Sequence, residues 1–424
     1  MKKIGCLFLF LLLFLFACVR EDDVPGANPE TGSNRVSHIV PIEDALSGLR
    51  EILAPLQKDT RAGRSYAVKG VDVVATGGAT RAAGASEGTD TLLYIVNFED
   101  DGYALLTADD RLEGVIALVD EGNISAEEFV ASAAATTPVP EMGGLPDFSI
   151  PLRMLIMRYV ENIEDEKEVG TPVFYTPWYP EVLCQPLMKT KWNQVWPFNI
   201  YCPVENGKNC VAGCVAIALA QIATYNQSVH NVGPDVLHEI ALDWNGIRAY
   251  LSDPDHTDPS PAALLVYAMG REVDMKYGSD ESSSNIDKAA RAMPWLGYKM
   301  VFNTRYHVEI IEEMLLERRL PVYIRGLAEF TTGKTGGHAW VIDGYYRYRR
   351  DKTSDDPSKC VSYTVFDTYY TELVHCNFGW GGLCNGYYIS NIFNLTNGAT
   401  IPDPGLGERN IENFVDKRML SYQL

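Results

Sequence analysis

The order of secondary-structure patterns in the second half of this 424-residue chain constrains its fold more than any other feature. Apolar residues recur at helical spacing over 213–225, 261–270, 283–292 and 308–318. From Pro321 onward the pattern changes to short runs rich in β-branched and aromatic residues, which are typical of strands. These strand-like runs cover residues 321–325, 339–343, 362–366 and 386–389. Helices followed by strands predict an α+β architecture, with a helical lobe preceding an antiparallel sheet lobe.

The first half of the chain has a separate pattern. Apolar residues at helical spacing predict an amphipathic helix over 43–57. Two apolar runs at 92–98 and 103–107, joined by a turn at Gly102, predict a β-hairpin. These elements indicate that the first half of the chain forms a separate small α+β domain.

Two further signals complete the first half. Ser125 and Glu128 form a capping box, which predicts the start of a short helix. The stretch 75–90 is rich in Gly, Ala, Ser and Thr, and we expect it to be a loop. This half contains no cysteine between residues 36 and 165, and its histidine is His38. We therefore expect no catalytic chemistry from it.

A charged and proline-rich stretch at 161–181 separates the two patterned halves. Such a composition is typical of an exposed domain boundary that proteases can cut. The predicted organisation is a first domain at 36–165, a linker at 166–184 and a second domain at 185–424.

The N-terminus has the pattern of an export signal. Lys2 and Lys3 precede an apolar run that ends at Ala17, and Cys18 follows directly. About 14 apolar residues are too few for a membrane span, which needs roughly 20. Residues 1–17 are therefore expected to be a signal peptide, although a retained membrane anchor is the alternative. The segment ending in Cys18 resembles the lipobox of bacterial lipoproteins, which implies lipidation of Cys18, a tether at 18–35 and attachment to the outer membrane or cell surface.

The charge of the chain excludes one class of partner. The net charge is −20 at pH 7, and removal of Lys2 and Lys3 with the signal peptide makes it more negative. No stripe of Lys and Arg offsets this charge, so a phosphate backbone would be repelled. We expect no nucleic-acid partner.

The cysteines suggest an oxidising compartment. Nine are present, of which Cys6 leaves with the signal peptide and Cys18 would carry lipid. If one of the remaining seven is a catalytic thiol, the other six can form three disulfides in any of 15 pairings. A zinc site is the alternative, but the spacings lack the close cysteine pairs that such sites use. We expect no metal and no cofactor.

Cys214 is the candidate nucleophile. It follows Gly213 and opens a helix of Ala, Leu and Ile, so its sulfur would feel the positive end of the helix dipole. That position favours the thiolate, which is the form that attacks carbonyl carbons. The alternative is that Cys214 is a buried structural cysteine. A candidate base elsewhere in the chain would favour the nucleophile over this alternative.

His338 is the candidate base. It lies between Gly337 and an apolar strand, and Asn377 follows at the end of a later strand. The order Cys, His, Asn, with His338 lying 124 positions after Cys214, fits the papain-type arrangement.

At this point the chain resembles the streptopain family of secreted cysteine proteases. The resemblance covers most of 185–424 and, more loosely, the first domain. The matching segments are 107–111, 191–194, 213–222, 277–284, 336–344 and 377–388.

The resemblance implies roles for individual residues. Cys214 would be the nucleophile and His338 the proton acceptor, while Gln194 and the backbone N–H of Cys214 would hold the oxyanion. Asn377 would orient His338. The substrate-binding residues would be Ser283, Gly337 and Trp380, with Trp380 also shielding the contact of Asn377 with His338.

Two departures from the family pattern stand out. Phe378 replaces a Trp, which keeps an aromatic wall but loses the indole N–H. The connection between Gly344 and His375 is longer than the family's short one.

The function implied is that of a papain-like cysteine endopeptidase. Its substrates would be proteins or peptides, and residues 36–165 would be an inhibitory prodomain removed by self-cleavage in the linker 166–184. Two alternatives remain. One is a catalytically idle surface lipoprotein that binds peptides or host proteins, and the other is an amidase of cell-wall peptides.

Overall fold

The computed structural model describes residues 39–57, 65–75, 80–82, 91–110, 112–133, 174–252, 258–329, 335–393 and 417–424. The predicted signal peptide, the tether and Cys18 lie outside these ranges. So does the segment 134–173, in which the predicted first domain ends.

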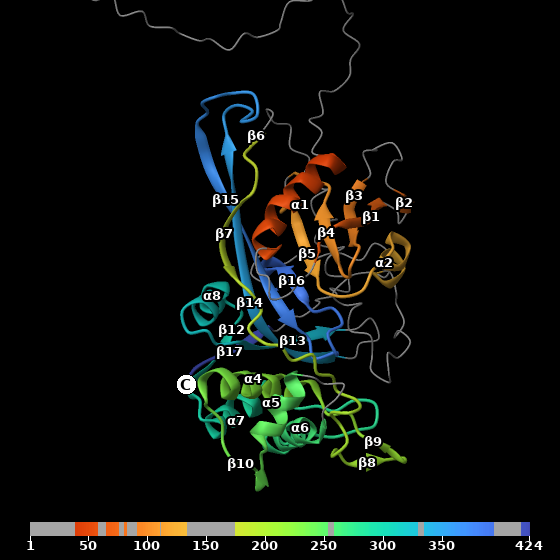
Figure 1. The fold of residues 1–424 in the computed structure, drawn as a ribbon, viewed down its shortest axis with the longest axis vertical. Helices are drawn as coiled ribbons and strands as arrows, with labels where there is room; N and C mark the ends of the chain where they lie inside the picture. The colour runs from red at the N-terminus through yellow and green to blue at the C-terminus, as the bar shows by residue number, and fades with distance from the viewer. Residues whose placement is uncertain are drawn as a thin grey trace, which may run out of the picture. The chain divides into compact units, whose positions relative to one another are not determined.

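The first half forms the helix and hairpin that its sequence predicts. Helix α1 (Ile42–Gln57) buries Leu49, Ile52 and Leu53, and it lies beside the strands of this half (Figure 1). Strands β3 (Thr91–Phe98) and β4 (Tyr103–Thr107) pair antiparallel, and Gly102 takes a φ of 79° in their turn. That left-handed conformation is one that glycine adopts without strain.

The capping box is confirmed, whereas the loop prediction is partly wrong. The Ser125 N–H donates to Glu128 Oε2 (2.9 Å), and the Glu128 N–H donates to Ser125 Oγ (3.2 Å), at the start of α2 (Ala126–Ala133). Within the predicted loop 75–90, residues Thr80–Ala82 form strand β2. Pairing with β1 (Val68–Ala75) supplies hydrogen bonds that the composition of this stretch did not predict.

The end of the predicted linker lies in a sheet. Strands β6 (Phe174–Tyr175) and β7 (Tyr179–Cys184) both pair with the 19-residue strand β14 (Thr335–Thr353). Pro180 is tolerated because β7 is an edge strand whose second side needs no ladder hydrogen bonds. Residues 174–184 are therefore part of the folded sheet.

The helical lobe follows, and its four predicted helices are confirmed with shifted ends. At its centre α4 (Cys214–His230) is buried along one continuous stretch, 215–226. Helix α5 was not predicted, although Trp244, Ile247 and Tyr250 recur at helical spacing and are buried. The other helices are α5 (Trp244–Ser252), α6 (Ser260–Glu272), α7 (Ile286–Ala292), the 3-10 turn η2 (Met293–Leu296) and α8 (Val308–Leu316).

The sheet lobe confirms the predicted fold class. All its strand pairs are antiparallel, in the order β12-β17-β13-β14-β15-β16. Two outer strands were not predicted, because they become strands only by pairing with each other and with β13. The bounds are β12 (Lys299–Arg305), β13 (Val322–Glu329), β15 (Val365–Asn377), β16 (Gly386–Ile389) and β17 (Arg418–Gln423).

One continuous sheet joins the two halves of the chain, which the sequence did not predict. Strand β5 (Val115–Val119) of the first half pairs with β16 through Val119 and Gly386 and the two following pairs. A Cβ on Gly386 would lie 2.2 Å from the Leu118 carbonyl oxygen, so only glycine permits this approach. The sheet then continues from β5 through β4, β3 and β1 to β2.

The prediction of three disulfides is wrong in this structure. No disulfide links any two of the seven cysteines between residues 184 and 384. Instead, the Cys184 sulfur lies 3.1 Å from Arg319 Nη1, and Cys376 is buried within β15. Cys184 and Cys376 thus lie on different elements in separate environments, so an even number of cysteines does not by itself imply pairing.

None of the helices in the described ranges combines the length and the apolar character needed to cross a bilayer.

Candidate active site

Cys214 begins the buried helix α4, as predicted. Gly213 before it takes a φ of 88° and offers no side chain to cap the helix, so the first N–H groups remain directed at the helix start. Cys214 is half-buried. Burial raises the pKa of its thiol above the ordinary value, and the nearby backbone N–H groups of Ala339, Val215 and Cys214 itself oppose this effect. In the full-length chain, burial changes the pKa of Cys214 more than the helix start does. The pKa is therefore raised, whereas the position at the helix start predicted that it would be lowered.

The contact with Ala339 brings nucleophile and base together. Ala339 directly follows His338 on β14, opposite Arg325 of β13, so the Cys214 sulfur lies against the strand that carries the histidine. Two segments 124 positions apart in the chain therefore meet at one point.

The loop before Cys214 is held by two other predicted segments. The Ala212 N–H donates to the Gln194 carbonyl oxygen (2.8 Å), and the Val211 N–H donates to the Gly278 carbonyl oxygen (3.1 Å). Ser282 Oγ donates to the Val211 carbonyl oxygen (2.7 Å). The segments 191–194 and 277–284 thus flank the nucleophile on the surface of the helical lobe.

Gln194 and Ser283 differ in which of their polar groups can bind a ligand. The Gln194 side chain makes no hydrogen bond with the described residues, so its amide group can serve a ligand. The Ser283 backbone N–H and carbonyl oxygen are both paired with Lys276 (2.9 Å each). The predicted contact of Ser283 with a substrate backbone would therefore need its side chain or an opening of this bridge.

His338 is buried, and its ring is oriented by the backbone. Its Nε2 lies 2.8 Å from the carbonyl oxygen of Phe378. Because a carbonyl can only accept, Nε2 carries the proton and Nδ1 is the nitrogen able to act as a base. Burial lowers the pKa of His338 to about 4, against a smaller opposing effect of the Phe378 hydrogen bond. The imidazole is therefore neutral at pH 7.

An aromatic cluster encloses the imidazole. The ring of Trp380 is centred 4.6 Å from that of His338, and Phe378 stacks on Trp380 at 4.9 Å. Trp340, two positions along β14, stacks parallel to His338 at 6.2 Å. Phe378 fills the place of the family's Trp as part of this wall. Gly337 adjoins His338 on the strand and places no side chain beside the ring.

The Asn377 side chain makes three hydrogen bonds with the described residues, none of them with His338. Its Oδ1 accepts from Gln221 Nε2 (3.3 Å) and from the Gly379 N–H (3.2 Å), and its Nδ2 donates to the Thr190 carbonyl oxygen (2.7 Å). The predicted orienting contact is not made in this structure, because the Phe378 carbonyl occupies the donor of the ring.

Gln221 is a contributor that the motif analysis did not single out. It is fully buried on α4, and besides contacting Asn377 it accepts from the Trp192 N–H (3.5 Å). Its place two turns after Cys214, within the otherwise apolar stretch 214–223, was the available sequence signal.

A buried ionic cluster lies behind the site. His375 Nδ1 lies 2.6 Å from Asp343 Oδ1, and His375 Nε2 lies 2.9 Å from Asp120 Oδ2. Burial lowers the pKa of His375, but the two carboxylates outweigh it and raise the pKa to about 10. Asp120 belongs to the first half of the chain, so this cationic ring connects the halves. Within the described ranges, no three His, Cys, Asp or Glu side chains are grouped as metal ligands would be.

The comparisons with known proteins agree with these motifs. Residues 192–388 match the sequence model of the Peptidase C10 family. Streptopain of Streptococcus pyogenes is 22% identical over 340 residues, which cover 70% of this chain and 73% of the relative. The thiol protease/hemagglutinin PrtT of Porphyromonas gingivalis is 23% identical over 349 residues, which cover 73% of this chain and 35% of that protein. The predicted resemblance to the streptopain family is confirmed.

A fragment of prointerpain A from Prevotella intermedia aligns with 78% of this chain and 94% of its own, at a TM-score of 0.47 and 19% identity.

Proposed function

Proceeding from the match of residues 192–388 to the Peptidase C10 family, we propose that this chain is a cysteine endopeptidase made as a zymogen. The observation that carries the proposal is the packing of α4 against β14, which places Cys214 close enough to Ala339, the residue after His338, for the Ala339 N–H to act on the thiol. A thiol at a helix start next to an imidazole is the arrangement that nucleophilic catalysis by cysteine requires.

The proposed reaction follows from these positions. His338 Nδ1 takes the proton of Cys214, and the sulfur attacks the carbonyl carbon of the scissile peptide bond. The Gln194 amide and the Cys214 N–H stabilise the oxyanion of the tetrahedral intermediate. The imidazolium then protonates the leaving amine, which departs and leaves a thioester on Cys214. Water attacks the thioester with His338 as base, releases the acid and restores the thiol.

The remaining site residues would assist this reaction. Asn377 would fix the loop that presents the Phe378 carbonyl to His338, and Trp380 would exclude water from that hydrogen bond. Gly337 leaves room for a substrate backbone. Ser283 lies on the flanking loop 277–284 and would contact substrate through its side chain.

The first half of the chain would be the inhibitory prodomain. Three contacts support a tight association: the pairing of β5 with β16, the Asp120–His375 pair and an ion pair between Lys191 and Glu121. Lys191 belongs to the segment 191–194 beside the nucleophile. We also propose export with a lipid on Cys18, which would place the enzyme at the outer membrane or cell surface.

Self-processing tests the proposal. Purified chain with Cys214 is expected to shorten, with a new N-terminus before residue 185, whereas Cys214→Ala stays full length. His338→Ala should lower peptide hydrolysis by several orders of magnitude, because nucleophile and base act as a unit. Equal shortening of the pure Cys214→Ala protein would refute self-cleavage, and full peptide hydrolysis by it would refute the nucleophile.

A further inference from the structure

The connection between Gly344 and His375 forms a long two-stranded arm. We call residues 344–375 the arm: its strands belong to β14 and β15 and pair from Gly344 with His375 to Thr353 with Val365. Figure 1 shows it rising beside the first half of the chain, next to α1 and β7.

Three alternate residues of the arm reach the first half of the chain. Because successive side chains of a strand point to opposite faces, residues 346, 348 and 350 share one face. Tyr346 Oη donates to the Ile52 carbonyl oxygen (2.7 Å), and Tyr348 Oη donates to that of Val115 (3.3 Å). Both tyrosines are fully buried by this contact surface.

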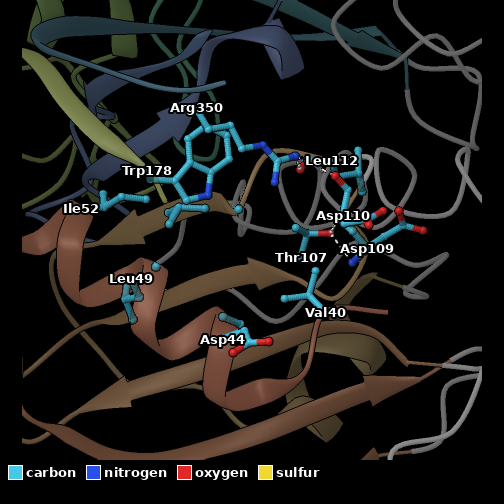
Figure 2. A pocket seen from close by; sticks show the side chains of 14 residues that line it. Val40, Asp44, Leu49, Ile52, Thr107, Asp109, Asp110, Leu112, Trp178 and Arg350 are labelled. Carbon is cyan, nitrogen blue, oxygen red and sulfur yellow. Dashed lines mark hydrogen bonds between the residues drawn. The ribbon is translucent and has the colours of Figure 1, made fainter. Parts of the chain in front are cut away.

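Arg350 makes the third contact and carries charge. Its Nη2 donates to the Asp110 carbonyl oxygen (2.6 Å) and more weakly to that of Leu112 (3.4 Å). Figure 2 shows this guanidinium pointing at Asp110 and Leu112, beside a small cavity that α1 also lines. Arg350 is half-buried, and a cation that donates to backbone carbonyls makes a strong hydrogen bond whose removal leaves the carbonyls without that donor.

Trp178 completes the same face. Its ring meets Tyr348 edge-on at 4.9 Å, and the Arg350 guanidinium lies 4.5 Å from its centre. A Cβ on Gly114 would lie 2.9 Å from Trp178 Nε1, and one on Gly48 would lie 3.4 Å from Cδ1. Glycines in two segments of the first half thus leave room for one indole of the second.

The opposite face of the arm serves the catalytic half instead. Arg347 pairs with Glu312 (2.9 Å), and Arg349 pairs with Glu181 (2.9 Å) and Asp351 (2.7 Å). Arg349 and Arg350 are therefore neighbours of the same residue type with contacts to different halves, which makes them a matched pair for experiment.

We propose that the arm is the element by which the catalytic half recognises and retains its own prodomain, so that cutting the connecting segment does not release it. The inference rests on the proposed function, in which the first half is a prodomain. The arm contacts α1, β5, Asp110 and Leu112, and its last residue, His375, pairs with Asp120. The β5–β16 pairing lies outside the arm. The contacts of the arm and the β5–β16 pairing do not involve the segment between residues 133 and 174, which connects the two halves. Both sets of contacts therefore persist after that segment is cut. Release then needs a second event, such as degradation of the prodomain.

The test uses the full chain with Cys214→Ala and a recognition sequence for an unrelated protease inserted between residues 133 and 174. After complete cutting, gel filtration at serial dilution measures the concentration at which the two fragments separate. The parent and Arg349→Ala should co-elute at micromolar concentration. Arg350→Ala should separate at concentrations about 10- to 100-fold higher than the parent, and Tyr346→Phe at about 3- to 10-fold higher.

Two results would overturn the inference. One is separation of the parent fragments at every concentration tested, and the other is co-elution of Arg350→Ala and Tyr346→Phe at the same dilutions as the parent. If uncut Arg350→Ala lacks the parent's cooperative unfolding transition, Tyr346→Phe alone decides. Failure of the proposed function would give a different result. In that case a cut chain with intact Cys214 would retain its prodomain and still hydrolyse peptide at the full rate of the processed enzyme. This outcome would disprove inhibition by the prodomain but not its retention.

Discussion

His338 Nε2 donates to the carbonyl oxygen of Phe378 across 2.8 Å, and not to the side chain of Asn377 one position earlier. The ring is therefore oriented by backbone, while Asn377 fixes the loop from which that carbonyl projects. With the pKa of His338 lowered to about 4 and that of Cys214 raised, the pair is a neutral imidazole and a neutral thiol at pH 7. A reactive thiolate–imidazolium ion pair forms only when the pKa of the thiol lies below that of the imidazole.

We predict that Cys214 reacts with iodoacetamide more slowly in the full-length chain than in the processed enzyme. At pH 7 the rate should differ by about tenfold or more, because each unit by which a thiol pKa lies above the pH lowers the thiolate fraction tenfold. Alkylation followed by intact mass distinguishes both forms in one sample. Cys214→Ala supplies the background labelling of the other cysteines, and equal rates in the two forms would contradict a closed, neutral pair.

The hydrogen bonds of Gln221 predict a positioning role. Gln221→Leu removes the donor to Asn377 and the acceptor for Trp192 N–H within a fully buried setting. We expect a loss of about 1–3 kcal/mol in the free energy of unfolding and a fall of about tenfold in kcat/KM of the processed enzyme. Gln227→Leu on the same helix, near its end, is the control. A purely structural role would lower stability but leave kcat unchanged per folded molecule, as active-site titration would reveal.

The sequence predicted the features that depend on short stretches of neighbouring residues. Cys214 at a helix start, His338 on an apolar strand and the β3–β4 hairpin each depend on a few neighbouring residues. Helix α1 and the Ser125–Glu128 capping box are of the same kind.

Relationships between distant segments were not predictable in that way. Asp120, Asp343 and His375 are unremarkable in the sequence and become a cluster only when β5, β14 and β15 are placed in one sheet. The prolines of 174–184 indicated a linker because composition cannot distinguish an exposed connection from an edge strand. The pKa of Cys214 depends on burial, which overrode the local effect of the helix start.

The Asp120–His375 pair predicts a pH-dependent stabilisation of the full-length chain. The pKa of His375 is raised from 6.5 to about 10, so its stabilisation is fully present below about pH 6.5 and is lost as pH rises towards 10. Asp120→Asn in the Cys214→Ala background should lower the free energy of unfolding by about 1–3 kcal/mol at pH 7, and by much less at pH 10. Asp120 is partly exposed, with 34% of its side chain accessible, which limits the effect.

Urea unfolding at pH 6, 7, 9 and 10 measures this difference. Glu121→Gln, which alters the more exposed pair with Lys191, is the control and should change stability by less than about 1 kcal/mol at every pH. A difference between parent and Asp120→Asn that is independent of pH would exclude a charged His375.

The last prediction concerns where the processed enzyme begins. Strand β7 pairs with Tyr345–Arg349 of β14, its Cys184 is 1% exposed, and the Cys184 carbonyl oxygen accepts from Tyr387 Oη (3.0 Å). A catalytic half that begins at residue 185 loses this strand, exposes an edge of the sheet and leaves the Tyr387 hydroxyl without its buried acceptor. We expect it to be less stable, by about 3 kcal/mol or more, than one that begins at Phe174, and to aggregate. N-terminal sequencing of the self-processed enzyme should therefore find its first residue at or before 174. Melting temperatures of chains beginning at 174 and 185 provide the comparison, and equal stability of the two would show that β7 is dispensable and that the cut can fall after it.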